Sequence, residues 1–571
     1  MTSWTLGLGL SHDSSGCLFA DDEPIVGVQL ERLTRHKYDG RKSEMARLVN
    51  YLLDVAGIGV DDLDTVAVSY PNADLPGRLQ VGGLDLGAGN VLHVGHHLAH
   101  AYSAFGPSGL DEAAVLVVDG HGDPYYEEDQ DQLYSGPEML RRLTARLTAP
   151  DDTFAAPRFE SESIYRFIRT GSPELLHRGH LTFGRRTGYT PLLFDPLGIG
   201  QNYRQVSAWL FGTGKSAGKV MGLASYAMEP LDLPPTFLAG PDGTPVLTDT
   251  WKAAVRDVLA ADPTIVRDHE WAAGLAGYVQ AATEELLLDL VRRAIRLSGT
   301  SALCMAGGVA LNATTNGRIE REEGLSAFYV QPASSDAGLA IGAALAARHL
   351  QTGRIPARQP VRDSWGRRYS PTEVAAAIGR HPEMERLPIE DPVGMVAERL
   401  AAGEVIGWFE GGAELGPRAL GHRSLVADPR SLGMRDHLNR NIKKREWFRP
   451  FAPAVLVERF EDWFQPGGAS RFMLSTTLVR RDRRSQVPAI THVDGTARVQ
   501  VVSPGEGEFR RLIEEFHRRT GVPMILNTSF NVAGEPIVET PEDALRAAEA
   551  MGISLLYLDG ILVRRNSIES P

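Results

Sequence analysis

Cysteine is scarce in this chain, since only Cys17 and Cys304 occur among 571 residues. Two cysteines so far apart exclude a disulfide framework and fit a reducing compartment. A basic excess is also missing, because 59 Lys and Arg stand against 72 Asp and Glu, a formal net charge of −13. Nucleic-acid-binding proteins normally carry basic excess on at least one domain, so we expect no nucleic-acid partner.

Long apolar runs are absent as well, and none approaches the length that spans a membrane. The first Lys or Arg is Arg32, so the N-terminus has no charged region of the kind that begins a signal peptide. Hydrophobic residues make up 43% and charged residues 23%, as in ordinary soluble enzymes. We therefore expect a cytoplasmic protein without a membrane partner.

The length predicts two or three domains, because 571 residues exceed what one core accommodates. Strand-like and helical apolar patterns alternate along the chain, which predicts an α/β fold with mixed sheets. We expect strands over 5–10, 17–20, 24–30, 65–70, 113–118, 302–306 and 405–409, and helices over 43–56, 271–297, 339–350 and 392–402.

A stretch with two prolines and two arginines, 353–360, indicates a linker. We place the domain boundary there, with domains over 1–357 and 358–571. The polar segment from Tyr125 to Leu192 is rich in Pro and Arg. We interpret it as an insertion with weak sheet content that helps to shape a substrate pocket.

Two histidines and two aspartates are candidates for a metal site. His96 and His100 are four residues apart, which on a helix places both imidazoles on one face. Asp119 follows an apolar strand, and Asp336 precedes an alanine-rich helix. Each residue taken singly is more often structural, but together they form a mixed N/O set suited to a divalent transition metal.

Gly307 and Gly308 follow a predicted strand, where they allow a ligand to approach the backbone closely. A helix after them would direct its N-terminus at a phosphate. Cations cluster later in this acidic chain, at Arg418, Arg423, Lys443, Arg445 and Arg449. Guanidinium and ammonium groups among apolar, Gly and Pro neighbours favour a polyphosphate pocket over a solvated surface. A polar turn with Ser529 and Asn531 ends another apolar strand.

Taken together and in this order, these motifs resemble the O-carbamoyltransferase family, which includes antibiotic-tailoring and nodulation-type carbamoyltransferases. The matching stretches cover nearly the whole chain and comprise His12–Ser15, Glu31–Arg35, His96–Ala101, Gly218–Tyr226, Gly307–Asn312, Ser334–Gly338, Gly416–Ser424, Arg449–Pro453 and Leu526–Asn531. The resemblance implies an N-terminal domain similar to TsaD-type proteins of the actin-like (ASKHA) superfamily. It also implies a C-terminal domain similar to YrdC.

The resemblance further implies a division of labour. The C-terminal domain would make carbamoyl-adenylate from ATP and carbamoyl phosphate, and the N-terminal domain would transfer the carbamoyl group to a hydroxyl of a small-molecule natural product of sugar or polyketide type. Both sites should connect through a protected path, because the adenylate hydrolyses in water. Fe²⁺ would be the metal, with Mg²⁺ beside ATP as a further candidate and a homodimer as a candidate assembly.

Residue roles follow from the same resemblance. Its metal ligands match His96, His100, Asp119 and Asp336. Arg418, Lys443, Arg445 and Arg449 would neutralise phosphates, Ser529 and Asn531 would contact the adenylate as it forms, and Gly307, Gly308 and Asn312 would hold it in the transfer site. Lys443 has a second lysine beside it, Lys444, so the register of the phosphate lysine stays open. Our own hypothesis makes His12 the base that accepts the hydroxyl proton.

Two rival functions stay open. The first is a tRNA-modifying enzyme that forms threonylcarbamoyl-adenylate, which the acidic charge balance disfavours. The second is a non-catalytic, actin-like nucleotide-binding scaffold, which the complete His/His/Asp/Asp set disfavours. Neither the acceptor nor the native metal can be identified from residue types alone.

Overall fold

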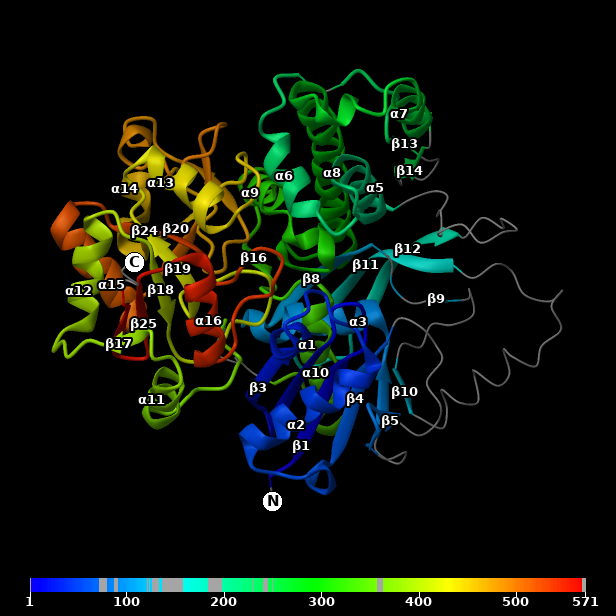
Figure 1. The fold of residues 1–571 in the computed structure, drawn as a ribbon. Coiled ribbons are helices and arrows are strands. Elements are labelled where there is room, and N and C mark those ends of the chain that lie inside the picture. The colour runs from blue at the N-terminus through cyan, green and yellow to red at the C-terminus, as the bar shows by residue number, and fades with distance from the viewer. Residues whose placement is uncertain are drawn as a thin grey trace. The chain divides into compact units, whose positions relative to one another are not determined.

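The computed structural model describes residues 2–70, 80–86, 91–120, 122, 124–125, 133–135, 158–182, 198–229, 231–239, 245–248, 250–356 and 363–566. The chain divides into two compact units (Figure 1). The first comprises Met1–Ile25 and Gly40–Val361, and the second comprises Val26–Asp39 and Arg362–Pro571. The predicted mixed α/β class is confirmed, because both units combine helices with sheets that contain parallel and antiparallel pairs.

The first unit contains a sheet with strand order β10-β7-β4-β1-β2-β3. The first two strands of the chain form an antiparallel hairpin, and β1 also pairs in parallel with β4, which pairs in parallel with β7. The strands span Trp4–Gly9 (β1), Ser15–Ala20 (β2), Glu23–Gln29 (β3), Thr65–Ser69 (β4), Val91–Val94 (β7) and Leu133–Ser135 (β10).

A second sheet in the same unit has the order β12-β11-β8-β15-β16. Its central strands β8 and β15 run parallel and are almost fully buried, as expected for strands covered on both faces. The strands span Glu112–Val118 (β8), Arg158–Ile168 (β11), Glu174–Thr182 (β12), Ala302–Ala306 (β15) and Ala327–Val330 (β16). Short strands lie at Gln80–Val81 (β5), Leu84–Asp85 (β6), Pro124–Tyr125 (β9), Phe237–Ala239 (β13) and Pro245–Leu247 (β14).

The expectation of weak sheet content over 125–192 is wrong for the part of that segment that the structure describes. β11 has 11 residues and β12 has nine, and β11 pairs directly with the buried strand β8. Charged residues of this polar segment are paired across strands: Arg178 Nε lies 3.2 Å from Glu160 Oε1, and Arg166 Nη2 lies 2.8 Å from Glu112 Oε1. Such cross-strand pairs make a polar strand compatible with a sheet.

Helices α3 and α10 pack on each other, with α10 against the first sheet and α3 against β8, β11 and β15 of the second. A Cβ atom at Gly342 of α10 would collide with the Ala99 carbonyl of α3, so glycine is needed for this close approach. Helices of the unit span Met45–Ala56 (α2), His96–Phe105 (α3), Ile199–Phe211 (α5), Ala217–Ala224 (α6), Thr250–Ala261 (α7), His269–Ser298 (α8), Ala313–Glu322 (α9) and Leu339–Thr352 (α10).

The second unit is built on an eight-stranded sheet with the order β17-β26-β25-β18-β19-β24-β20-β23. Helices α12 and α15 pack on each other, with α15 against β20 and β24 and α12 against β25 (Figure 1). Strands span Met384–Arg386 (β17), Ile406–Phe409 (β18), Arg423–Ala427 (β19), Ala452–Leu456 (β20), Thr476–Leu478 (β21), Thr496–Arg498 (β22), Gln500–Val502 (β23), Met524–Ser529 (β24), Leu555–Leu558 (β25) and Ile561–Arg565 (β26). Helices span Pro371–Gly379 (α11), Pro392–Ala401 (α12), Leu432–His437 (α13), Phe460–Trp463 (α14), Gly507–Thr520 (α15) and Pro541–Met551 (α16).

A short N-terminal segment, Val26–Asp39, belongs to the second unit. It contains the end of β3 and helix α1 (Leu30–Thr34), and the Gly27 N–H donates to the Trp365 carbonyl. The predicted boundary at residues 357/358 lies outside the described residues. The assignment of one function to each half of the chain stays a prediction. Among the described residues, no helix is both long and apolar enough to cross a bilayer.

Candidate metal centre and anion pocket

Three elements of the first unit place the candidate metal ligands. His96 and His100 lie in the first turns of α3, and both side chains are buried. Asp119 follows the last residue of β8, and Asp336 begins the 3-10 turn that leads into α10. Strand end and helix start are positions where the backbone stops being paired, so the side chains there can turn toward a common point.

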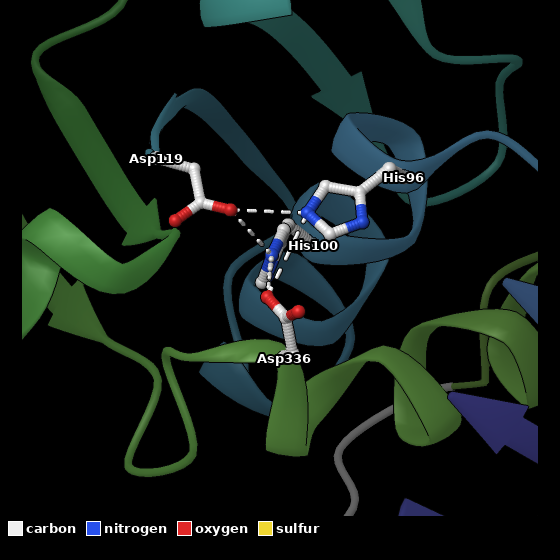
Figure 2. Close-up of side chains that lie close together, drawn as sticks. All are labelled: His96, His100, Asp119 and Asp336. Atoms are coloured by element: carbon white, nitrogen blue, oxygen red, sulfur yellow. Dashed lines mark hydrogen bonds and ion pairs between the residues drawn. The ribbon is translucent and has the colours of Figure 1, made fainter. Parts of the chain in front are cut away.

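All four side chains converge (Figure 2). His96 Nε2 lies 3.0 Å from Asp119 Oδ2 and 3.7 Å from Asp336 Oδ1. His100 Nε2 lies 3.8 Å from Asp119 Oδ2 and 3.6 Å from Asp336 Oδ1. The structure therefore brings together four ligand atoms from three segments that are far apart in sequence.

The donor set fits a divalent metal ion. Ligand–metal bonds of about 2.1 Å imply neighbouring ligand atoms roughly 3.0–3.4 Å apart, close to the separations seen here. His100 Nε2 is buried and has no hydrogen-bond partner among the described residues, although carboxylates face it. Burial raises the pKa of Asp119, but the neighbouring imidazoles of His100 and His96 outweigh burial and hold the pKa well below its usual range. The two carboxylates are thus held ionised, as ligands must be.

Second contacts orient the carboxylates. The Gly308 N–H donates to Asp119 Oδ1 at 3.0 Å, which links the two-glycine turn to the centre. Gly307 has φ 90°, and a Cβ atom there would collide with the Val118 carbonyl, so only glycine allows this approach. His12 Nδ1 lies 3.3 Å from Asp336 Oδ2 while its side chain is 64% exposed. His12 therefore lies at the rim of the centre, where an acceptor could reach it.

Asn312 follows the two-glycine turn and is bonded to other protein groups. Its Oδ1 accepts the Thr315 N–H at 3.2 Å and caps α9, and its Nδ2 donates to Gln280 Oε1 at 2.9 Å. The helix expected directly after the glycines begins only at Ala313, after a 3-10 turn. A ligand contact by Asn312 stays a prediction, since both ends of its amide have protein partners.

Lys443 lies at the centre of the candidate anion pocket in the second unit. Its Nζ donates to the Ser529 carbonyl at 2.8 Å, to the Asn531 carbonyl at 3.0 Å and to Asn531 Oδ1 at 2.8 Å. Burial, and then the charges of Arg445, Arg449 and Lys37, hold its pKa well below the usual value. The three predicted residues Lys443, Ser529 and Asn531 are therefore neighbours.

Arginines surround this lysine. Burial and the charge of Arg449 lower the pKa of Arg418 to about 10, and burial and the same charge lower that of Arg445 to about 9. Arg418 Nε is buried without a hydrogen-bond partner among the described residues. Arg445 is held by protein groups, with its Nε donating to Asn439 Oδ1 at 2.7 Å and its guanidinium 4.4 Å from the Phe451 ring centroid. Arg418 has more freedom to bind a ligand than Arg445 has.

Arg423, also counted among the cations, is fully buried and donates to the Glu410, Gly411 and Glu539 carbonyls. Its guanidinium also lies 3.4 Å from the Phe409 ring centroid. These contacts indicate that Arg423 holds the protein backbone rather than a phosphate.

Arg498 is a pocket residue that sequence reasoning missed. Burial, then the charges of Arg418, Arg445 and Arg449, place its pKa well below the usual value, and its Nε has no hydrogen-bond partner among the described residues. The available signal was a lone arginine in the alternating strand segment Thr496–Val502. The sequence analysis also did not identify Lys37, whose charge lowers the pKa of Lys443. Lys37 lies in the N-terminal segment, far from Lys443 in sequence.

Comparison with protein families gives two matches. The family model described as carbamoyltransferase C-terminus matches residues 397–565, and the one described as carbamoyltransferase N-terminus matches residues 253–345. The C-terminal match contains Arg418, Lys443, Arg449 and Arg498. The N-terminal match contains the two-glycine turn and Asp336.

Curated relatives align over most of the chain. Nodulation protein NolNO of Sinorhizobium fredii is 30% identical over 97% of this chain and 79% of its own length. The uncharacterized protein sll1178 of Synechocystis is 31% identical over 98% of this chain and 97% of its own. Nodulation protein NolO of Bradyrhizobium diazoefficiens is 32% identical over 82% of this chain and 78% of its own length. Among solved structures, full-length HypF in the phosphate- and nucleotide-bound form is 14% identical, covering 61% of this chain and 56% of that one with a TM-score of 0.38, a likeness too weak to carry an argument.

Proposed function

Because the chain belongs to the carbamoyltransferase family and is a carbamoyltransferase enzyme, we propose that it is an ATP-dependent O-carbamoyltransferase that works in two steps. Water cleaves carbamoyl phosphate to carbamate and phosphate in the second unit. A carbamate oxygen attacks the α-phosphorus of ATP, pyrophosphate leaves, and carbamoyl-adenylate forms. In the first unit, a hydroxyl oxygen of the acceptor attacks the carbamoyl carbon and AMP leaves.

The observation that carries this proposal is the uncompensated charge of the second unit. Burial lowers the pKa values of five cations, and neighbouring arginines lower four of them further, all except Arg449: Arg418, Lys443, Arg445, Arg449 and Arg498. Among the residues that the structure describes, Glu446 is the carboxylate that pairs with one of these five cations, 3.9 Å from Arg449 Nη1, and one carboxylate does not balance five cations. Burying unpaired charge is costly, so the pocket requires a multiply charged anion. A triphosphate with its Mg²⁺, together with carbamoyl phosphate, meets that requirement.

Activation through an adenylate explains why one enzyme needs two sites. Carbamate is a poor electrophile at neutral pH, and joining it to AMP creates a mixed anhydride with a good leaving group. Arg418, Arg449 and Arg498 would stabilise the charge on the α-phosphate and the departing pyrophosphate. Lys443 would hold the Ser529–Asn531 turn against the nucleotide, consistent with its contacts to that turn.

Transfer would take place at the His/His/Asp/Asp centre. A divalent ion bound by His96, His100, Asp119 and Asp336 would polarise the carbamoyl oxygen as a Lewis acid, and Fe²⁺ is the ion that the family resemblance implies. Gly307 and Gly308 let the adenylate approach the backbone beside Asp119. His12, exposed at the rim, would accept the hydroxyl proton of the acceptor. If His12→Asn kept the full transfer rate, that role would be lost.

The acceptor we propose is a hydroxyl of a small molecule of sugar or polyketide type. The acidic charge balance supports a small molecule over tRNA, and the aligned relatives include nodulation proteins. Radiolabelled carbamoyl phosphate, offered with ATP and separate panels of aminosugars and polyketides, tests this choice. Label found only in tRNA would contradict it.

The deciding experiment needs no knowledge of the acceptor. The full-length protein is mixed with Mg-ATP and carbamoyl phosphate, pyrophosphate is measured, and a quenched sample is analysed by mass spectrometry for carbamoyl-adenylate. We expect pyrophosphate release that depends on carbamoyl phosphate. A parallel reaction with bicarbonate and threonine tests the tRNA-modification rival. Release only in that parallel reaction, or in neither, would remove the proposal.

A further inference from the structure

Side chains hold the part of the loop around Arg418, while backbone hydrogen bonds tie its earlier part to residues 363–366. The loop runs over residues 410–422 and joins β18 to β19. Glu414, buried within this loop, accepts three backbone N–H groups through Oε1: Leu420 at 2.7 Å, His422 at 2.9 Å and Arg423 at 3.1 Å. One carboxylate oxygen therefore fixes the curvature of the loop on the C-terminal side of Arg418.

Two amide side chains hold the same part of the loop from outside. Gln500 Nε2 donates to the Leu420 carbonyl at 2.7 Å, and Asn527 Nδ2 donates to the Ala419 carbonyl at 3.2 Å. The two amides also bond to each other at 2.9 Å. The residues that directly follow Arg418 are thus fixed on both their N–H and carbonyl sides.

The N-terminal side of Arg418 is held by the segment Val26–Asp39. Gln29 Oε1 accepts the Gly416 N–H at 3.0 Å, and Arg32 Nη2 donates to the Gly416 carbonyl at 2.6 Å. Arg32 Nη2 also donates to Gln29 Oε1 at 3.3 Å, so the two side chains form one bracket around a single peptide residue. Gly416 has φ 112°, a conformation that other residues rarely adopt.

We propose that Gln29 and Arg32 are positioning residues of the activation site, acting through Gly416 to aim Arg418 at the phosphates. This inference rests on the proposed function. It assigns to the adenylate-forming site two residues that are almost 390 positions away from Arg418 in sequence. They touch no substrate themselves.

The burial of Arg32 supports a specific role for its side chain. Its side chain is fully buried, and its Nε lies 3.6 Å from Glu31 Oε1. Buried ion pairs contribute little to the free energy of folding. The hydrogen bond from the Arg32 guanidinium to the Gly416 carbonyl is therefore better explained by positioning of the loop than by stabilisation of the fold. The same segment holds Tyr38 at φ 56° by a bond from its N–H to Glu31 Oε2 at 2.9 Å. Strained residues of this kind persist where surrounding contacts determine them fully.

Preorganisation is the physical reason that such a bracket affects rate. An arginine that stabilises developing charge must already point at it, because a loop free to move would reorient during the reaction. Pro417 and Gly416 precede Arg418 directly, so an error at Gly416 is transmitted to Arg418 over two residues.

A double-mutant cycle tests the proposal, with kcat/KM for carbamoyl-phosphate-dependent pyrophosphate release as the readout. We expect Arg418→Ala to lower kcat/KM about 100-fold, as for loss of one stabilising donor. Arg32→Met should lower it about tenfold, and the Arg32→Met/Arg418→Ala protein should match Arg418→Ala within about twofold, because residues that act as a unit are not additive. A merely structural role of Arg32 predicts effects that multiply.

Gln29→Met is the second variant. It removes a neutral side chain, so it can be measured if the Arg32→Met protein fails to fold. We expect a smaller loss, about threefold to tenfold, that likewise vanishes in the Arg418→Ala background. Arg35→Met is the matched control: Arg35 lies in the same segment and donates to two backbone carbonyls, Ile537 at 2.7 Å and Pro536 at 2.8 Å, but not to Gly416. Its effect should multiply with that of Arg418→Ala.

Two outcomes overturn the inference: multiplicative losses for both Arg32→Met and Gln29→Met, or single variants with wild-type kcat/KM. Failure of the proposed function looks different, because the wild-type protein itself would then release no pyrophosphate. In that case the same cycle is read from the Kd of Mg-ATP measured by calorimetry, and wild-type Kd values for the Arg32 and Gln29 variants would reject the positioning role.

Discussion

The two candidate sites treat electrical charge in opposite ways. In the first unit, two carboxylates and two imidazoles face one another at 3.0–3.8 Å, so ligand groups for a dication surround one point. In the second unit, burial and the charges of neighbouring arginines lower the pKa values of Arg418, Arg498 and Lys443. One site is completed by a cation and the other by an anion. The function proposed above uses this contrast, with phosphates bound in the second unit and a divalent ion held by the His/His/Asp/Asp set in the first.

The largest expected effect separates the two sites completely. His100→Gln removes one metal ligand, and since loss of even an outer-shell partner costs about 10–100-fold, we expect transfer to an acceptor to fall by more than about 100-fold. Pyrophosphate release should stay within about twofold of wild type, because the anion pocket is unchanged. Metal content by elemental analysis and both rates check this.

His93→Gln is the control for that variant. His93 is also buried in the first unit, on β7, and burial lowers its pKa, but it belongs to no ligand cluster among the described residues. The His93→Gln protein should keep its metal. A His100→Gln protein with full metal content, or with both rates reduced equally, would contradict the separation of the sites.

The next largest effect concerns Arg498 in the anion pocket. Arg498→Met should lower pyrophosphate release about 100-fold while metal content is unchanged, because one preorganised donor to developing charge is lost. Arg430→Met is the control, since Arg430 is paired with Asp428 at 2.6 Å, outside the pocket. A loss of similar size in both variants would show that Arg498 acts through stability.

A smaller expected effect is the uptake of protons when ATP binds. Burial and neighbouring cations hold the Lys443 pKa well below normal, and a bound phosphate raises it again. ATP binding should therefore take up protons, not release them. Calorimetry in buffers of different ionisation enthalpy measures this uptake, and Lys443→Met should remove it. Identical binding enthalpies in every buffer would count against an anion pocket built around this lysine.

The smallest effect concerns stability. His422 lies beside Asp363, with Nε2 3.3 Å from Oδ1; burial lowers its pKa, but the hydrogen bond and charge of Asp363 prevail and raise it from 6.5 to about 9. A raised pKa means that the stabilisation is complete below pH 6.5 and is lost as pH rises toward 9. We expect the free energy of unfolding to fall by about 2 kcal/mol over that window. Urea melts at several pH values check it, and a slope unchanged in His422→Gln would exclude this histidine as the source.

Local patterns predicted many elements correctly. Strand β15 covers Ala302–Ala306 as predicted, and α8 extends the predicted helix 271–297 only to His269–Ser298. The helix over 43–56 is shorter than expected, because a 3-10 turn at Lys42–Glu44 precedes α2. Periodicity is a local property, so it survives without knowledge of the partners. The prediction of the carbamoyltransferase family is confirmed, since it depended on the order of many motifs.

Long-range partners could not be predicted in the same way. β11 lies in a polar segment for which weak sheet content was predicted, and its pairing with β8 and β12 comes from partners outside its own local pattern. Arg498 and Lys37 come from segments with no shared motif, and their proximity to Lys443 depends on sheet order and on the placement of Val26–Asp39 in the second unit.

By itself, the sequence determined which chemical groups this protein possesses and which short elements carry them, because helix spacing, strand alternation and charge are written in neighbouring residues. Only the tertiary structure decided which groups meet: that His96, His100, Asp119 and Asp336 share one point, that five cations of the second unit lie close together, and that Gln29 and Arg32 bond to Gly416. The physical reason is that charges and hydrogen bonds act over a few ångströms of space, whatever the separation along the chain.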